Sequence, residues 1–269
     1  MQLKIFKSPW GMEGTLRENM AKIAAAGYAG VEDWLPAPAD RPLFRELLVE
    51  HNLEYIAMVH SAGPDHADAF ARSMDAVAAF GPLRITSHSA KDSMPYGEQV
   101  AFFGKAVEIE KQYGIPVGHE THRQRAMFTP WTTAQLLREI PDLKITADFS
   151  HWVCVCESLL ADQRDNLELA FERTLHIHGR VGFAEGPQVP HPGAPEYAQE
   201  LAAHEGWWEE IRKRHAAAGA PFLTFTPEFG PPGYMHTLPF TNSPVADLWE
   251  VCLWMAKRFS AKWEQAASR

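Results

Sequence analysis

Short apolar segments alternate with longer amphipathic segments along almost the whole chain. Eight of the apolar segments have the length and the alternating pattern of strands. They cover residues 3–7, 30–34, 53–60, 83–88, 115–120, 143–148, 173–180 and 221–228. Helical stretches such as LRENMAKIAAAG and WWEEIRKRHAAAG lie between them, and several end on glycine, as helices commonly do. This alternation is typical of a parallel sheet covered by helices.

The number of predicted strands favours a closed barrel over an open sheet. A (β/α)8 barrel takes ~250 residues, and this chain has 269. The sequence has no linker, low-complexity tract or short repeat that would mark a domain boundary. We therefore predict an α/β fold with a single TIM-barrel domain over residues 1–269. A doubly wound open sheet is the alternative, but no GxGxxG motif occurs early in the chain.

The alternation of side chains within each strand indicates which residues face the barrel interior. In PFLTFTPE, Leu223 and Phe225 share one face, so we expect that face to pack on the helices and Glu228 to point inward. The same reasoning predicts polar residues at the ends of six consecutive strands. They are His60, His88, Glu120, Asp148, His178 and Glu228. The carboxyl ends of the strands are where TIM-barrel active sites lie.

Three of these strand-end residues, Glu120, Asp148 and Glu228, are carboxylates. Carboxylates held close together repel one another and raise one another's pKa unless a cation lies between them. A divalent metal ion would relieve this repulsion. The sequence therefore predicts a metal site at the mouth of the barrel.

Composition and charge indicate which kinds of binding partner do not suit this protein. The formal net charge of −9 argues against nucleic acid or an anionic membrane surface, which clustered Lys and Arg usually bind. The three cysteines form neither a disulfide framework nor a Cys-x-x-Cys motif. The sequence shows no signal-peptide pattern at its start and no run of about 18 apolar residues. We expect a cytoplasmic protein that acts on a small molecule and does not bind a membrane.

Five segments resemble, in this order, those of the xylose isomerase-like TIM-barrel superfamily, which includes sugar isomerases and epimerases, inosose dehydratases and endonuclease IV. They are GYAGVEDW (27–34), VGHETHR (117–123), ITADFSHW (145–152), LHIHGRVG (175–182) and TPEFGPPGY (226–234). The resemblance covers essentially the whole chain. It implies one divalent ion held by Glu120, Asp148, His178 and Glu228. Mn²⁺ is the expected ion, with Mg²⁺, Co²⁺ or Zn²⁺ as alternatives.

The resemblance also suggests substrate-binding residues, with some departures. His151 resembles a histidine that contacts substrate oxygens in relatives. The ketose 3-epimerases have an arginine six residues after the metal-binding histidine, where this chain has Ala184, so Arg180 is the candidate instead. His60 and His88 resemble two early zinc ligands of endonuclease IV. Because the loop after the seventh strand lacks the Asp-x-His pair of that enzyme, DNA repair is disfavoured.

Four further features have both a functional and a structural interpretation. His122 follows Glu120 closely and could contact a substrate carbonyl or hydroxyl, or simply pack in its loop. Glu32 points inward and could bind a hydroxyl or form a structural hydrogen bond. His176 is predicted to be a buried, hydrogen-bonded histidine. The proline-rich loop 182–197 could cover the site or could only stiffen the chain.

These observations lead to the hypothesis of a divalent-metal-dependent sugar isomerase or epimerase. It would move a proton next to a carbonyl through an enediolate, with Glu120 and Glu228 as catalytic base and acid. A lyase or dehydratase acting on a keto-sugar or keto-glycoside is the close alternative. An endonuclease IV-like phosphodiesterase and a non-catalytic sugar-binding subunit are weaker ones. The expected partner is a small carbohydrate, and a homodimer or homotetramer is compatible with the hypothesis.

Overall fold

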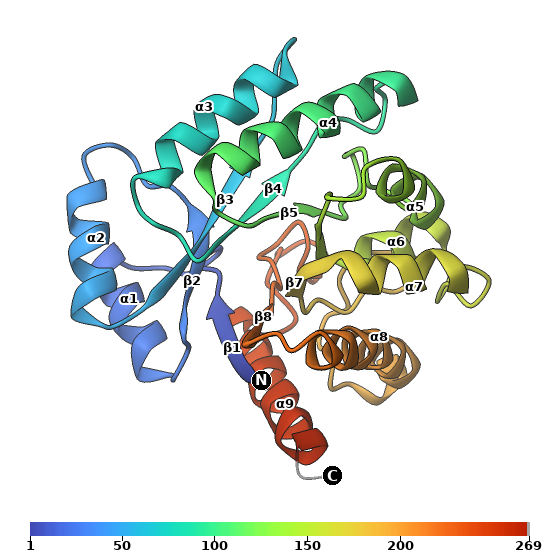
Figure 1. Ribbon diagram of the computed structural model, residues 1–269. Helices are drawn as coiled ribbons and strands as arrows, with labels where there is room; N and C mark the ends of the chain where they lie inside the picture. Colours follow the sequence, from blue (N-terminus) through green and yellow to red (C-terminus); the bar gives the residue numbers. More distant parts are fainter. Residues whose placement is uncertain (268–269) are drawn as a thin grey trace.

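Eight parallel strands pair in chain order in the computed structural model, which describes residues 1–267 (Figure 1). They are β1 Gln2–Lys7, β2 Gly30–Trp34, β3 Glu54–His60, β4 Arg84–His88, β5 Val117–Glu120, β6 Ile145–Ala147, β7 Thr174–His178 and β8 Phe222–Thr226. Since β1 also pairs with β8, the sheet closes into a barrel. The predicted single-domain TIM barrel is therefore confirmed, and the open-sheet alternative is wrong.

Helices surround the barrel and connect its strands (Figure 1). They are α1 Leu16–Ala25, α2 Arg41–Glu50, α3 His66–Ala78, α4 Tyr96–Tyr113, α5 Pro130–Glu139, α6 Phe149–Cys156, α7 Arg164–Arg173, α8 Ala198–Ala217 and α9 Leu248–Ala267, with the short 3₁₀ helix η1 Pro195–Tyr197 before α8. Local sequence sets several helix ends. Thr15 and Glu18 form a capping box at the start of α1, and Gly114 ends α4 in the left-handed conformation.

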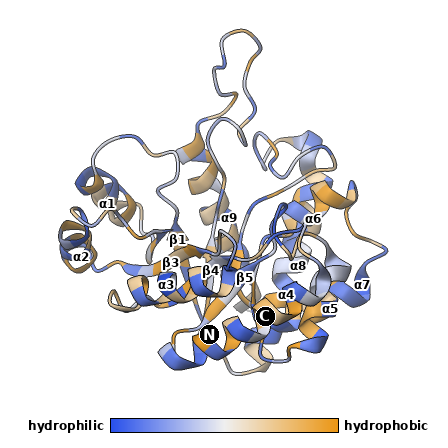
Figure 2. Ribbon diagram, turned by 90° about the horizontal axis from the view of Figure 1, so that it is seen from above, coloured by the Kyte–Doolittle hydropathy of each residue, from blue (hydrophilic) through white to orange (hydrophobic). Residues whose placement is uncertain are grey.

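The strands separate an apolar shell from a polar interior. On the helix-facing side, the ring of Phe225 stacks on Phe259 of α9, with centroids 3.9 Å apart. Hydrophobic and hydrophilic positions are interspersed along the outer helices in Figure 2, as amphipathic helices require. On the inner side, Thr224 and Thr226 are fully buried and hydrogen-bonded to other interior residues. This division agrees with the predicted alternation.

Three of the strands end earlier than predicted. Strand β6 ends at Ala147, because Asp148 leaves the sheet and caps the start of α6. Strand β7 ends at His178 and β8 at Thr226, so Arg180 and Glu228 lie just beyond the sheet. The residues predicted to end these strands thus begin the loops at the mouth. None of the helices in residues 1–267 has the length and hydrophobicity that a membrane span requires.

Candidate active site

A cavity of about 330 Å³ opens at the carboxyl ends of the strands. Five of the residues predicted for the site border it: His88, Glu120, His122, Arg180 and Glu228. They come from segments at the ends of β4, β5, β7 and β8. Barrel closure therefore brings together side chains that lie up to 140 residues apart in the sequence.

The four predicted metal ligands form one buried cluster, and two of them, Glu120 and Glu228, border the cavity. Glu120, Asp148, His178 and Glu228 each offer a ligand atom, and these atoms all lie within 4.8 Å of one another. His178 Nδ1 lies 3.2 Å from Glu120 Oε1 and 3.0 Å from Glu228 Oε2. The donor set of three carboxylates and one imidazole fits a divalent cation such as Mn²⁺ or Mg²⁺.

Arg180 neutralises part of the negative charge in this cluster. Its Nε lies 3.1 Å from Asp148 Oδ2, its Nη2 also binds that oxygen, and Nη2 lies 3.0 Å from Glu228 Oε2. Burial alone would lower the pKa of Arg180, but the two carboxylates outweigh it and raise the pKa. Burial raises the pKa of Asp148 to about 6, although Arg180 acts against this shift. The guanidinium of Arg180 is therefore a permanent charge among the candidate ligands.

The start of α6 fixes the orientation of Asp148. As the residue that precedes the helix, Asp148 accepts a hydrogen bond from the backbone N–H of Ser150 at 3.1 Å, through Oδ1. The hydroxyl of Ser150 donates to the same oxygen. This cap leaves Oδ2 on the side of Arg180 and His151. Oδ1 of Asp148 thus caps the helix, and Oδ2 belongs to the site.

The predicted substrate-binding histidines occupy different depths. His88 pairs with Glu120 Oε2 at the cavity wall. The rings of His122 and His151 are 3.9 Å apart, and Arg180 Nη2 donates to His151 Nε2 at 3.1 Å. Burial lowers the pKa of His122 to about 4 and that of His151 well below its usual value, so both are neutral at pH 7. His151 is fully buried behind the cavity wall.

His60 lies outside the cavity. Its side chain is exposed, and the ring of Trp34 contacts it edge-on at 5.5 Å. Trp34 itself borders the cavity and also contacts His88, at 5.3 Å. The structure therefore places His60 outside the cavity, in contact with one of the residues that border it.

Three aromatic residues of the cavity wall were missed by the sequence analysis: Trp10, Trp34 and Tyr234. Trp34 ends β2 and could have been found from its strand-end position. Trp10 and Tyr234 lie in loops and meet only in the folded chain, with ring centroids 5.1 Å apart. Gly230 makes this possible, because a Cβ atom there would lie 2.3 Å from the Trp10 ring.

His176 and the proline-rich loop 182–197 make structural contacts. His176 is buried and hydrogen-bonded to Thr224 and Glu32, as predicted. In the proline-rich loop 182–197, the amide of Gln188 bonds both backbone groups of Gly230, at 2.7 and 3.1 Å. The loop therefore braces the segment that follows Glu228, at the wall of the cavity.

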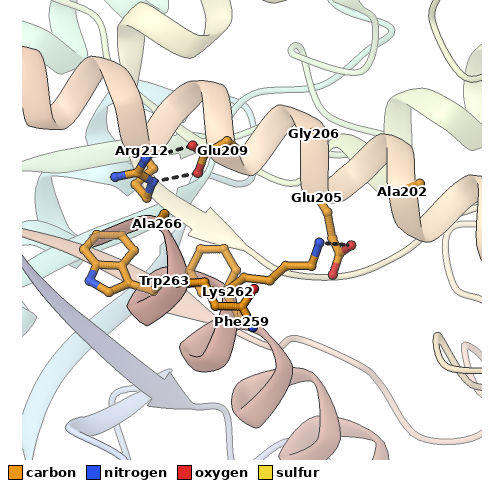
Figure 3. Close-up of a pocket in the computed structure, with 10 residues that line it drawn as sticks. Ala202, Glu205, Gly206, Glu209, Arg212, Phe259, Lys262, Trp263 and Ala266 are labelled. Carbon is orange, nitrogen blue, oxygen red and sulfur yellow. Dashed lines mark hydrogen bonds and ion pairs between the residues drawn. The ribbon is translucent and has the colours of Figure 1, made fainter. Parts of the chain in front are cut away.

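A larger groove, about 560 Å³, lies between α8 and α9 (Figure 3). Its charged groups are paired with one another: Lys262 with Glu205 at 2.7 Å and Arg212 with Glu209 at 2.6 Å. It is formed by two outer helices and shares no lining residue with the cavity at the strand ends. The smaller cavity at the strand ends is therefore the candidate active site.

Comparison with known proteins adds a family match and several similar structures. The xylose isomerase-like TIM barrel family matches residues 20–182. A D-allulose 3-epimerase from Methylomonas sp. is 18% identical, with a TM-score of 0.65 over 97% of each chain. The 3-keto-D-glucoside 4-epimerase of E. coli is 14% identical, with a TM-score of 0.63 over 97% of this chain and all of that one. At such identities the likeness shows a shared fold.

A further similar structure is a probable 3-DHS dehydratase from Bacillus anthracis. It is 16% identical, with a TM-score of 0.60 over 96% of this chain and 98% of that one. No curated protein matches the sequence. The fold is thus shared by proteins described as epimerases and by one described as a dehydratase.

Proposed function

Because the chain belongs to the xylose isomerase-like TIM barrel family, we propose that it is a divalent-metal-dependent isomerase or epimerase of a sugar or sugar derivative. The observation that carries the proposal is the buried cluster of Glu120, Asp148, His178 and Glu228 at the cavity. Similar structures include epimerases described as acting on allulose and on a keto-glucoside, which supports a small carbohydrate as substrate.

The charge balance of the cluster supports a bound cation. Three carboxylates are buried together, and the side chain of each is at most 7% exposed. Arg180 and His178 offset part of their charge. A divalent ion held by the four residues would supply Lewis-acid stabilisation of the negative charge that develops on a substrate oxygen. Mn²⁺ suits this oxygen-rich set with one imidazole, and Mg²⁺, Co²⁺ or Zn²⁺ would also fit.

The four residues lie at different depths, which suggests different roles for them. Glu120 and Glu228 border the cavity, whereas Asp148 and His178 are fully buried beneath it. Glu120 and Glu228 can therefore reach the substrate. In the proposed mechanism one of them takes a proton from the carbon next to the substrate carbonyl, and the other returns a proton to the substrate.

The surrounding residues would hold the sugar. Arg180 Nη1 is buried and has no hydrogen-bond partner within residues 1–267, so it is available to a substrate oxygen. His88 and His122 border the cavity and would contact hydroxyl groups, while Trp10 and Trp34 offer apolar faces. We assign His60 to the outer end of a bound substrate.

His151 has a less direct part in the proposal. It is fully buried, and its Nε2 accepts a hydrogen bond from Arg180. Its hydrogen bond orients the guanidinium that borders the cavity. We therefore propose that Arg180 contacts the substrate and that His151 acts indirectly, by orienting Arg180.

The experiment that tests the function combines metal analysis with two variants. Purified protein should bind Mn²⁺ and exchange a substrate proton with D₂O when offered a panel of ketoses and keto-glycosides. Glu120→Gln and Glu228→Gln should each lose turnover and keep the circular dichroism spectrum of the wild type. Full activity in both variants, or failure of the wild type to bind any divalent ion, would contradict the assignment.

Elimination is the second candidate reaction. The same proton abstraction can expel a substituent from the adjacent carbon, and one similar structure is described as a probable dehydratase. The two reactions differ in their products. Deuterium incorporation without an elimination product favours the epimerase, whereas release of water or an alcohol favours the lyase.

A further inference from the structure

Below the metal cluster, a fourth carboxylate lies in the barrel interior. Glu32 of β2 is 1% exposed and contacts residues from three other strands. Its Oε1 lies 2.6 Å from Thr86 Oγ1 and 2.9 Å from His178 Nε2. Its Oε2 lies 2.9 Å from His176 Nε2 and also binds the hydroxyl of Thr226. The carboxylate therefore has four polar contacts and little freedom to rotate.

The chemistry of these contacts fixes the direction of each hydrogen bond. An ionised carboxylate only accepts hydrogen bonds, so Nε2 of both histidines must carry a proton. The two imidazoles and two hydroxyls around Glu32 can all donate to its oxygens.

The other nitrogen of His178 faces the proposed metal site. When Nε2 carries the proton, the lone pair of a neutral imidazole is on Nδ1. Nδ1 is the atom that lies 3.2 Å from Glu120 and 3.0 Å from Glu228. The hydrogen bond to Glu32 therefore points the metal-binding nitrogen toward the other ligands.

We propose that Glu32 is a positioning residue that holds His178 in the tautomer and ring orientation required for metal binding through Nδ1. This inference rests on the proposed function. Carboxylates that accept the second N–H of a metal-binding histidine commonly fix its tautomer, and their loss typically costs 10- to 100-fold in affinity. The hydroxyls of Thr86 and Thr226 hold Glu32 in place. Within residues 1–267, neither hydroxyl is hydrogen-bonded to a candidate metal ligand.

A second carboxylate–histidine pair provides a matched control. Glu110 of α4 lies 2.8 Å from Nε2 of His119, a fully buried residue of β5. His119 packs against the rings of Phe70 and Phe103, on the helix-facing side of the strand. Glu110→Gln thus makes the same chemical change in a similar pair outside the site.

The first experiment compares Mn²⁺ binding by calorimetry in the wild type, Glu32→Gln and Glu110→Gln. Glu32→Gln should bind Mn²⁺ about 10- to 100-fold more weakly than the wild type, and Glu110→Gln should match the wild type. If the wild type binds Mn²⁺ and the two variants bind it equally, Glu32 has no positioning role while the metal site stands. If the wild type binds no divalent ion, the proposed function itself is overturned.

The second experiment needs no variant of Glu32, so it does not depend on whether Glu32→Gln folds. Long-range ¹H–¹⁵N correlation spectra of the Zn²⁺-loaded wild type report which nitrogen of His178 carries the proton, with His178→Gln identifying its signals. We expect a proton on Nε2 and none on Nδ1. A proton on Nδ1, with Nε2 bound to zinc, would overturn the inference even if zinc binds.

Discussion

Arg180 binds Asp148 through two nitrogen atoms of its guanidinium, Nε and Nη2, which both reach carboxylate oxygen Oδ2. The same Nη2 lies 3.0 Å from Glu228 Oε2. One buried side chain thus contacts two of the four proposed metal ligands. A divalent ion and this guanidinium would share the same carboxylates, which makes the charge of Arg180 a determinant of both stability and metal binding.

Arg180→Met should destabilise the metal-free protein and increase its response to metal. Removing one partner of a buried ion pair leaves uncompensated charge and typically costs about 3–5 kcal/mol. Because Mn²⁺ would neutralise the same carboxylates, its addition should raise the Tm of the variant more than that of the wild type. Thermal unfolding with and without Mn²⁺ measures both effects.

Arg212→Met is the control, since Arg212 pairs with Glu209 in the groove between α8 and α9, away from the cavity, and partly exposed helix pairs of this kind are worth about 0–1 kcal/mol. An equal Tm shift on Mn²⁺ addition in Arg180→Met and the wild type would show that the guanidinium and the ion do not share ligands.

Asp33, at the wall of the cavity, should make the unfolding free energy depend on pH. Burial raises the pKa of Asp33 to about 6, from an ordinary value of 3.8. The folded protein therefore binds more protons than the unfolded chain between these values, and the Asp33 contribution to stability falls as the pH rises through this window. It is constant above about pH 7.

The matched variant is Asp33→Asn, which keeps the acceptor for the backbone N–H of Trp34 and removes the charge. Urea unfolding at pH 5 and pH 7 should show this variant gaining stability over the wild type with rising pH, by at most about 3 kcal/mol in all. A stability difference that does not change between pH 5 and pH 7 would rule out the raised pKa.

Gly179 separates His178 from Arg180 and permits both to point inward. A Cβ atom at this position would lie 1.9 Å from the ring of Phe225. Gly179→Ala should therefore cost about 1–3 kcal/mol through overpacking and weaken Mn²⁺ binding by moving the end of β7. Denaturant unfolding and calorimetry measure the two effects.

Gly206 of α8 gives the opposite expectation, because a Cβ atom there meets nothing within 4 Å. Gly206→Ala should stabilise the protein by up to about 1 kcal/mol and leave metal affinity unchanged. Equal stability of the two alanine variants would contradict the packing argument at Gly179.

Trp34→Ala should weaken substrate binding more than it affects catalysis. The ring borders the cavity, contacts His88 and is 39% exposed, so it is available to the apolar face of a sugar. Loss of such an aromatic contact is worth about 0.5–1.5 kcal/mol, which corresponds to roughly a two- to tenfold rise in KM. Steady-state kinetics with the substrate identified in the sugar panel test this.

Trp131→Ala is the matched control, because Trp131 is 50% exposed at the start of α5 and is not among the cavity residues within 1–267. A KM that rises equally in both variants, or a loss of kcat with unchanged KM in Trp34→Ala, would remove Trp34 from the substrate site.

The sequence by itself determined the barrel and the approximate position of its active end. Strand and helix periodicities are visible within short segments of the sequence, so the order of strands and helices can be predicted from the sequence alone. Side-chain alternation is equally local, and it was enough to assign Glu228 and His178 to the interior. Three strands were predicted to end one or two residues too late, at Asp148, Arg180 and Glu228. The backbone leaves the sheet before these residues, and their side chains belong to the site.

Only the tertiary structure decided which polar groups meet. Glu32 and Thr226 are 194 residues apart and bond only because the barrel closes between β1 and β8. The pairing of Arg180 with Asp148 and the contact of Trp10 with Tyr234 likewise join separate loops. Such contacts depend on strand register and on close packing of distant segments, and no local pattern in the sequence encodes these distances.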